Sequence, residues 1–175
     1  KAVVPPAEWI AKIRAALDAR EDPDFVIMAR TDALAVNGVD DAILRAQLAC
    51  DAGADLFFVE APTTIGEMRR ICAEVPGPCL ANNVETGRSP LLPAADLQAL
   101  GYAAVVFPVA ATYAVAHALA ELFATIRRTG TTEAFLPRLF AFDAFNDLVG
   151  LPAQRRREAA LQEYAEALVA RHQPR

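Results

Sequence analysis

Four short apolar runs lie along the chain, and a segment in which apolar residues recur every three or four positions follows each of them. The runs are rich in β-forming residues and are bounded by turn formers, so each predicts a strand. The periodic segments predict amphipathic helices. The predicted strands cover residues 25–29, 56–59, 79–81 and 103–107, and the predicted helices cover about 6–19, 40–52, 65–75, 94–100 and 111–128.

This alternation of strand and helix predicts an α/β fold with a parallel sheet. The strands begin near residues 25, 55, 78 and 103, which gives spacings of 30, 23 and 25 residues. One unit of a (β/α)8 barrel has this length, since about 250 residues make eight units. We therefore expect a TIM-type barrel of which this chain supplies the C-terminal four units, the other four lying upstream in a longer protein. A small open sheet is the alternative.

The strand–helix rhythm ends at Gly130. Residues 135–149 form a dense apolar patch, and about 153–171 form a last amphipathic helix. The eighth helix already closes a barrel, so a further helix with an apolar lead-in is expected to pack on another subunit. We predict a half-barrel over residues 1–130 and a helical extension over residues 131–175 that packs on a second subunit.

Composition and charge narrow the class of protein. A chain of 175 residues that is 54% hydrophobic can bury a substantial core. The net charge of −5 and the lack of a basic stripe argue against a nucleic-acid partner. No apolar run reaches the roughly 18 residues of a membrane span, so no membrane partner is expected. Three cysteines without Cys-x-x-Cys spacing predict reduced thiols in a cytoplasmic protein.

Charged and amide side chains follow three of the predicted strands. Arg30 and Asp32 follow the first strand, Glu60 the second, and Asn82, Asn83 and Glu85 the third. The carboxyl ends of parallel strands form the ligand sites of βα folds. Arginine binds a carboxylate or phosphate through two parallel hydrogen bonds, glutamate can transfer protons, and an amide can donate to an enolate oxygen. The pattern therefore predicts a site for an anionic substrate.

Structural roles are the alternatives for the same side chains. Arg30 and Glu60 could form an ion pair across two strand ends. Asp32 could accept hydrogen bonds from the backbone of the following loop. Surface or turn roles are the alternatives for Glu85, Ser89 and Pro90.

Four motifs carry a family resemblance: ARTDA at 29–33, AGADLFFVEA at 52–61, LANNVETGRSP at 80–90 and FNDLVGL at 145–151. With them the chain resembles the isocitrate lyase/phosphoenolpyruvate mutase superfamily over nearly its whole length. The resemblance is greatest to members like 2-methylisocitrate lyase, 2,3-dimethylmalate lyase and oxaloacetate decarboxylase. It implies a (β/α)8 barrel, Mg²⁺ or alternatively Mn²⁺, and an enolate intermediate. It also implies a homotetramer, a dimer of dimers that swap a C-terminal helix.

The resemblance also implies roles for single residues. Arg30 matches the arginine that binds the substrate carboxylate, and Glu60 matches the glutamate near the substrate and the waters of the metal. The family's paired aspartate ligands and its lid, with the acid/base cysteine, lie upstream of Lys1, so no direct metal ligand is expected in this chain. The implied substrate-binding residues are Arg30, Asp32, Glu60, Asn82, Glu85, Ser89, Pro90 and Tyr113.

Tyr113 marks a departure from the family pattern. Several lyases of the family carry an arginine at this position, which would bind a further carboxylate of the substrate. Tyrosine removes this second clamp, so a small diacid is favoured over a tricarboxylate such as methylisocitrate.

The expected function is therefore a Mg²⁺-dependent lyase that cleaves a carbon–carbon bond of a small 2-hydroxy- or 2-oxo-dicarboxylate. Glu60 and Arg30 are its expected catalytic residues, and Glu60 could also reach the metal through water. Phosphonomutase chemistry at a phosphorus–carbon bond, on the same barrel, is the first alternative. A non-catalytic oligomerisation module is the second.

Overall fold

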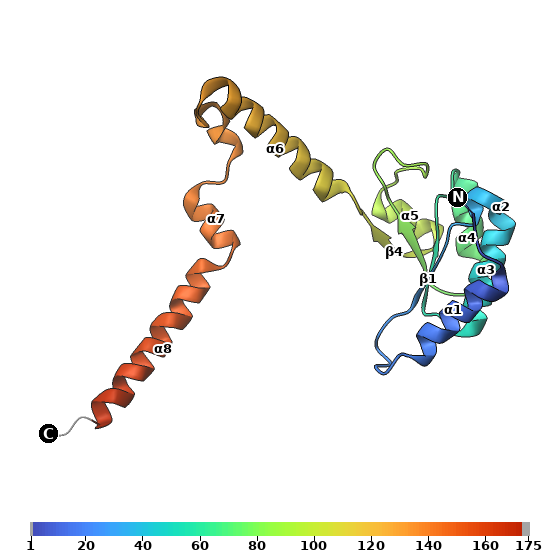
Figure 1. Cartoon of the computed structure of the whole chain (residues 1–175), viewed down its shortest axis with the longest axis horizontal. Helices are drawn as coiled ribbons and strands as arrows, with labels where there is room; N and C mark the ends of the chain where they lie inside the picture. Colours follow the sequence, from blue (N-terminus) through green and yellow to red (C-terminus); the bar gives the residue numbers. More distant parts are fainter. Residues whose placement is uncertain (1, 173–175) are drawn as a thin grey trace. The chain divides into compact units, whose positions relative to one another are not determined.

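The computed structural model describes residues 2–172 and contains a sheet of four parallel strands (Figure 1). Each strand pairs with the strand that follows it along the chain. Parallel neighbours need a crossover connection, and the predicted helices provide it. The predicted α/β fold with a parallel sheet is confirmed. The strands are β1 (Met28–Thr31), β2 (Leu56–Val59), β3 (Cys79–Asn82) and β4 (Tyr102–Val106).

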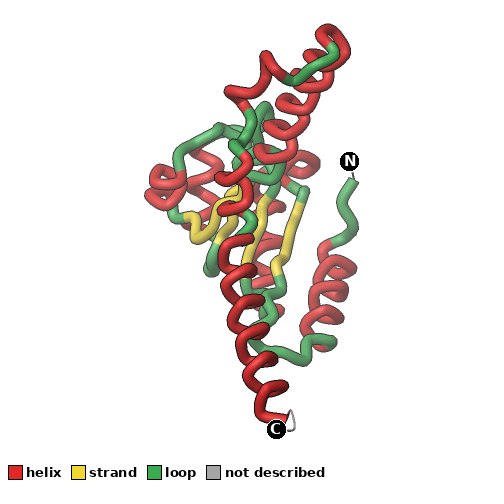
Figure 2. Tube along the Cα trace, turned by 90° about the vertical axis from the view of Figure 1, so that its left-hand side faces the viewer, coloured by secondary structure: helices red, strands yellow, loops and turns green. Residues whose placement is uncertain are grey.

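Helices cover one face of this sheet, as Figures 1 and 2 show. Helix α3 contacts both β1 and β2, and α5 contacts β4. Helix α4 begins with a capping box in which the Glu67 N–H donates to Thr64 Oγ1 at 3.1 Å and the Thr64 N–H donates to Glu67 Oε2 at 3.2 Å. The helices are α1 (Pro6–Asp18), α2 (Leu34–Asn37), α3 (Val39–Ala52), α4 (Ile65–Glu74) and α5 (Ala94–Leu100).

The apolar faces of the helices and the sheet form one core. Phe57, Ile71 and Leu97 are each at most 2% exposed within it. Phe58 and Leu80 are also buried but lie outside this cluster of residues. Successive residues of a strand point to opposite faces, so Phe58 belongs to the face opposite Phe57.

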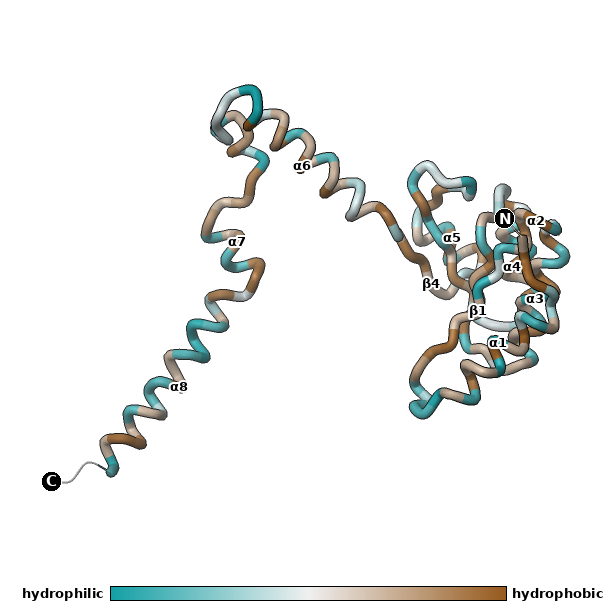
Figure 3. Tube along the Cα trace, in the orientation of Figure 1, coloured by the Kyte–Doolittle hydropathy of each residue, from teal (hydrophilic) through white to brown (hydrophobic). Residues whose placement is uncertain are grey.

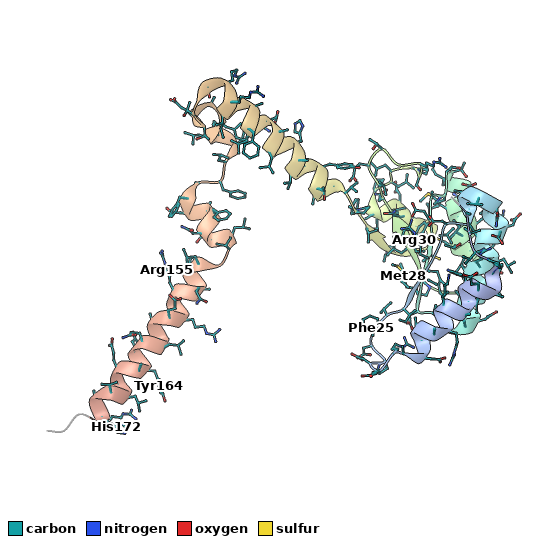
Figure 4. All side chains as sticks on the ribbon, viewed as in Figure 1. Phe25, Met28, Arg30, Arg155, Tyr164 and His172 are labelled. Atoms are coloured by element: carbon teal, nitrogen blue, oxygen red, sulfur yellow. The ribbon has the colours of Figure 1, made fainter. Side chains whose placement is uncertain are left out.

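The first strand is not where the sequence predicted it. Pairing with β2 begins at Met28 and continues to Thr31, whereas the prediction was 25–29. Phe25 and Val26 precede the first paired residue and are 64% and 58% exposed. The apolar pattern was misleading here because β1 is an edge strand, with β2 as its one neighbour in the described sheet. Arg30 therefore lies within β1, where Figure 4 labels it, and not beyond its end.

The chain divides into two compact units, residues 1–115 and 116–175, which we call the sheet unit and the helical unit. The boundary falls within α6, and the division predicted at residue 130 remains a prediction. The apolar patch at 135–149 forms two short helices that the sequence did not predict. The elements are α6 (Ala110–Thr129), the 3-10 helix η1 (Glu133–Arg138), α7 (Phe142–Leu148) and α8 (Leu151–His172).

The helical unit buries little apolar surface. Phe135 is buried, and the Arg138 guanidinium lies over its ring at 4.5 Å while pairing with Glu121 of α6. Phe142 and Tyr164 are 79% and 68% exposed, and Figure 3 shows apolar positions along α7 and α8. Among the helices that the structure describes, none has the length and apolar character to cross a membrane.

Candidate active site

Three polar side chains meet at the carboxyl ends of β1, β2 and β3. Asn82 Nδ2 donates to Glu60 Oε2 at 3.3 Å, and Arg30 Nη2 lies 3.5 Å from the same oxygen. The Glu60 N–H donates to the Thr31 carbonyl at 3.0 Å, which holds the end of β2 against the end of β1. Parallel pairing thus brings together three residues that are 30 and 22 positions apart along the chain.

The Arg30 side chain contacts protein groups on one side and is exposed to solvent on the other. Its Nη2 lies 3.2 Å from Asp32 Oδ1, and its guanidinium lies 4.8 Å from the centre of the Phe58 ring. The side chain nevertheless remains 46% exposed. An ion pair this exposed contributes only about 0–1 kcal/mol to stability, so stabilising the fold is a weak reason for an arginine here.

Two side-chain oxygens, one at the last residue of β3 and one in the segment after it, are buried without a hydrogen-bond partner in the described part of the chain. They are Asn82 Oδ1 and Glu85 Oε2. A buried acceptor without a donor costs about 1–3 kcal/mol, and native proteins rarely leave one in that state. Both oxygens are therefore candidates to accept a hydrogen bond from, or to coordinate, a group that the chain itself does not supply.

A pocket of about 620 Å³ opens beside Glu60 and Asn82. This volume lies within the range of small-molecule sites, about 300–1,000 Å³. One part of its wall is apolar and the other is polar, as expected for a site that holds a carbon skeleton and orients its charged ends. The lining residues are Ala35, Val36, Glu60, Ala61, Asn82, Val84, Gly87, Arg88 and Ser89.

The backbone is strained at the pocket wall. Ala61, which directly follows Glu60, has a φ of 57°. A residue with a Cβ atom in this left-handed region costs on the order of 1 kcal/mol, and such strain concentrates at functional sites. The backbone conformation of Ala61, where the chain leaves β2, is therefore energetically unfavourable.

The remaining predicted site residues have different positions. Ser89 lines the main pocket, and Pro90 lies with Ser89 beside a much smaller cavity. Glu85 contributes the buried oxygen described above. Tyr113 lies on α6 and is 53% exposed, and no hydrogen bond or ion pair in the described residues joins its side chain to the pocket.

Asn83 and Arg88 have roles that the sequence did not reveal. The Asn83 amide donates to the Leu92 carbonyl at 2.8 Å and accepts the Leu92 N–H at 3.2 Å, so this strand-tip asparagine fastens a loop. Arg88 lies in that loop and lines the pocket. The sequence feature that could have indicated Arg88 was a positively charged residue a few positions beyond the end of a predicted strand.

The described residues contain no cluster of three or more histidine, cysteine, aspartate or glutamate side chains that could hold a metal alone. The oxygens of Glu60, Asn82 and Glu85 are nevertheless of the kind that Mg²⁺ and Mn²⁺ prefer. The donor set therefore fits part of the surroundings of such an ion, and further carboxylates would have to complete it.

The fold and this site define an α/β protein with a polar pocket at its strand ends, and comparison with known proteins gives its family. The model of the phosphoenolpyruvate phosphomutase family matches residues 1–127, so the chain belongs to this family, within the isocitrate lyase/phosphoenolpyruvate mutase superfamily. The resemblance inferred from the motifs is thereby confirmed.

Individual relatives catalyse several reactions. The chain is 44% identical over 149 residues to 2,3-dimethylmalate lyase of Eubacterium barkeri, covering 85% of this chain and 52% of that protein. It is similar in structure to oxaloacetate acetylhydrolase in complex with 3,3-difluorooxalacetate (TM-score 0.80, 29% identity, 93% of this chain and 55% of that one). It is also similar to phosphonopyruvate hydrolase in complex with oxalate and Mg²⁺ (TM-score 0.76, 31% identity, 90% and 56%). The chain thus spans about half the length of these relatives.

Proposed function

We propose that the chain is the C-terminal half of a (β/α)8 barrel whose strand ends form part of a Mg²⁺-dependent carbon–carbon lyase site. The order of the strands supports the barrel, because β1 to β4 follow one another without the reversal of a doubly wound sheet. The observation that carries the function is the convergence of Arg30, Glu60 and Asn82 beside a pocket of about 620 Å³.

The proposed substrate is a small 2-hydroxy- or 2-oxo-dicarboxylate. Arg30 would bind the carboxylate next to the reacting carbon through two parallel hydrogen bonds, since its guanidinium is exposed on one side. Cleavage of the carbon–carbon bond leaves an enolate, and the same guanidinium would stabilise its developing negative charge. The arginine then contributes most in the transition state, which is what raises kcat.

Glu60 and Asn82 would act as a pair. The amide of Asn82 donates to Glu60 Oε2, which fixes the orientation of the carboxylate and leaves Oε1 to accept a proton or to orient a water. Asn82 Oδ1 has no donor in the described chain and would accept a hydrogen bond from the substrate or from a metal-bound water. Asn82 is therefore a positioning residue for Glu60 in this scheme.

Mg²⁺, or Mn²⁺ in its place, would supply Lewis-acid stabilisation of the negative oxygen that forms on cleavage. Glu60, which lines the pocket, is the residue of this chain best placed to bind its water ligands. The carboxylates that contact the ion directly would come from the other half of the barrel.

Phosphonate chemistry is the second candidate, because the family takes its name from a phosphomutase and a hydrolase of phosphonopyruvate is among the similar structures. Arginine binds a phosphonate as readily as a carboxylate. A ³¹P NMR screen with phosphonopyruvate separates the two functions. Conversion to phosphoenolpyruvate or to inorganic phosphate would favour phosphonate chemistry, and an unchanged spectrum beside turnover of a diacid would favour the lyase.

We propose in addition that the helical unit makes contacts between the subunits of a homotetramer. Its exposed apolar side chains, Phe142 and Leu148 among them, are of the kind that subunit interfaces bury. Sedimentation of Phe142→Asp and Leu148→Asp variants should show smaller assemblies than the parent protein. An unchanged distribution would contradict the proposal.

Replacement of Arg30 tests the lyase function in the full-length protein. Arg30→Ala should lower kcat/KM for the best diacid substrate by roughly 100-fold, on the order of 3 kcal/mol, with the fold intact by circular dichroism. The kcat/KM of Arg30→Lys should lie between those of the parent protein and of Arg30→Ala, because lysine keeps the charge but cannot form the two parallel hydrogen bonds. Arg69→Ala, at an exposed position of α4, is the matched control and should not change kcat/KM. Wild-type efficiency in a folded Arg30→Ala variant would refute the proposed role.

A further inference from the structure

One cation in the pocket has no counter-charge. Arg88 lines the same cavity as Glu60 and Asn82, and it forms no ion pair with any other residue that the structure describes. Arg30, in contrast, lies near two carboxylates, those of Asp32 and Glu60. Arg88 thus lines the pocket without a carboxylate partner, whereas Arg30 lies at its edge, where its Nη2 is 3.5 Å from Oε2 of the lining residue Glu60.

The loop that carries Arg88 is closed at its base. The two hydrogen bonds between the Asn83 amide and the Leu92 backbone, at 2.8 and 3.2 Å, join the end of β3 to the residues before α5. Asn83 is only 4% exposed, so water competes little for this pair. The loop of residues 84–91 therefore starts and ends at fixed points.

A tight turn also fixes the residues just before Arg88. The Gly87 N–H donates to the Val84 carbonyl at 3.1 Å, and Thr86 has a φ of 59°. A Cβ atom on Gly87 would lie 3.1 Å from both Cβ and O of Val84, so a larger residue there would require Val84 to shift by a few tenths of an ångström. Arg88 is thus attached to a preorganised turn, which lowers the entropy lost when it binds a ligand.

We propose that Arg88 binds the distal carboxylate of a four-carbon diacid whose reacting carboxylate is held by Arg30. This assignment rests on the proposed function and adds the feature by which the pocket selects its substrate. Val36 and Val84, on the apolar part of the wall, would face the carbons between the two carboxylates. The wall there accommodates small alkyl substituents, because it offers no polar group to be desolvated.

Arg88 is the one cation among the described residues that line the pocket. Tyr113 carries no positive charge and is not among the lining residues. A distal carboxylate in this pocket would therefore find its counter-charge in the loop after β3. A site that pairs with a charged group discriminates strongly against analogues that lack the group, because the protein charge then loses water without gaining a partner.

Two probes of different length test this assignment by calorimetry in the full-length protein with Mg²⁺. Oxalate has its two carboxylates directly bonded, so it can occupy the reacting end alone. 3,3-Difluorooxaloacetate has the same end and a distal carboxylate. Arg88→Gln should weaken binding of difluorooxaloacetate by about tenfold or more and leave oxalate within about twofold. Arg88→Lys should recover part of the loss.

The other outcomes are equally informative. Arg69→Gln removes the same charge from α4 and should change neither affinity. Equal effects of Arg88→Gln on both probes, or no effect on either, would overturn the role of Arg88 and leave the lyase proposal standing, provided that the parent protein binds both probes. Failure of the parent protein to bind either probe would overturn both proposals together.

Discussion

The sheet unit and the helical unit use apolar residues in opposite ways. In the sheet unit, helices and strands enclose a continuous core, and Phe57 within it is 1% exposed. In the described part of the helical unit, Phe135 is the one buried apolar side chain, and α6, α7 and α8 contain none. Phe142 is 79% exposed. Two phenylalanines of the same chain thus occupy the two extremes of burial.

This difference separates the apolar surface that the chain buries within its own fold from the apolar surface that it leaves exposed. Burying a phenylalanine is worth about 1.5–3 kcal/mol, and the sheet unit obtains this within its own fold. This core supports the strands whose ends place Arg30 Nη2 and Asn82 Nδ2 at 3.5 and 3.3 Å from Glu60 Oε2. The helical unit leaves the same kind of surface uncovered, which is the condition under which subunits associate.

The largest predicted effect comes from truncating these two phenylalanines in the full-length protein. Phe57→Ala should lower the free energy of unfolding by about 3–5 kcal/mol, because it leaves a cavity in the core. Phe142→Ala should change it by less than about 0.5 kcal/mol when the protein is dilute enough to be monomeric. Urea unfolding monitored by circular dichroism measures both. Similar losses for the two variants would mean that the helical unit has a core of its own.

A glycine-to-alanine substitution beside Phe57 tests how tightly the core of the sheet unit is packed. A Cβ atom at Gly77 would lie 2.3 Å from Cε2 of Phe57, a ring with almost no freedom to move, so Gly77→Ala should destabilise the protein by about 1–3 kcal/mol. Gly66→Ala is the control, because its Cβ atom would meet only Thr64 Oγ1 at 3.7 Å.

Thermal unfolding of the two glycine variants side by side measures this effect. We expect Gly66→Ala, near the start of α4, to be neutral or to stabilise by about 0.4–1 kcal/mol. A stable Gly77→Ala variant would show that the ring of Phe57 can shift and that the core is less tightly packed than the contacts indicate.

The sequence predicted the sheet unit well because its signals are local. Strand β2 and helix α5 have the predicted bounds, since an apolar run or a helical period is complete within a few residues there. The start of β1 was missed, because pairing with β2 decides where an edge strand begins and hydrophobicity does not. The short helices η1 and α7 were missed because a dense apolar patch without a clear period fits several conformations.

The site was predictable in part. Arg30, Glu60 and Asn82 could be placed together because the carboxyl ends of parallel strands meet at one edge. The different roles of Asn82 and Asn83 could not be predicted, because they depend on which face of the strand each amide leaves. Arg88 enters the pocket through the fold of a loop, which has no periodic signal.

The smallest predicted effect concerns a surface carboxylate and depends on pH. The Thr63 N–H donates to Glu67 Oε2 at 2.6 Å, with the Thr63 hydroxyl and the Thr64 N–H on the same oxygen. These hydrogen bonds hold the pKa of Glu67 below its ordinary value of 4.5. A carboxyl whose pKa is lower in the folded state stabilises the protein above the unfolded pKa, and this stability is lost as pH falls through the folded pKa.

Glu67→Gln should therefore lower the stability of the sheet unit by about 0.3–1 kcal/mol at pH 7, because glutamine can still accept these hydrogen bonds but lacks the negative charge that a helix N-terminus favours. The deficit should shrink as the pH falls below 4.5, because the parent carboxyl then becomes protonated and loses its advantage over the amide. Urea unfolding at a series of pH values measures it. Glu163→Gln on the exposed helix α8 is the matched control and should show no such trend. A deficit that stays constant down to pH 3 would mean that the shape of the side chain, and not its charge, caps α4.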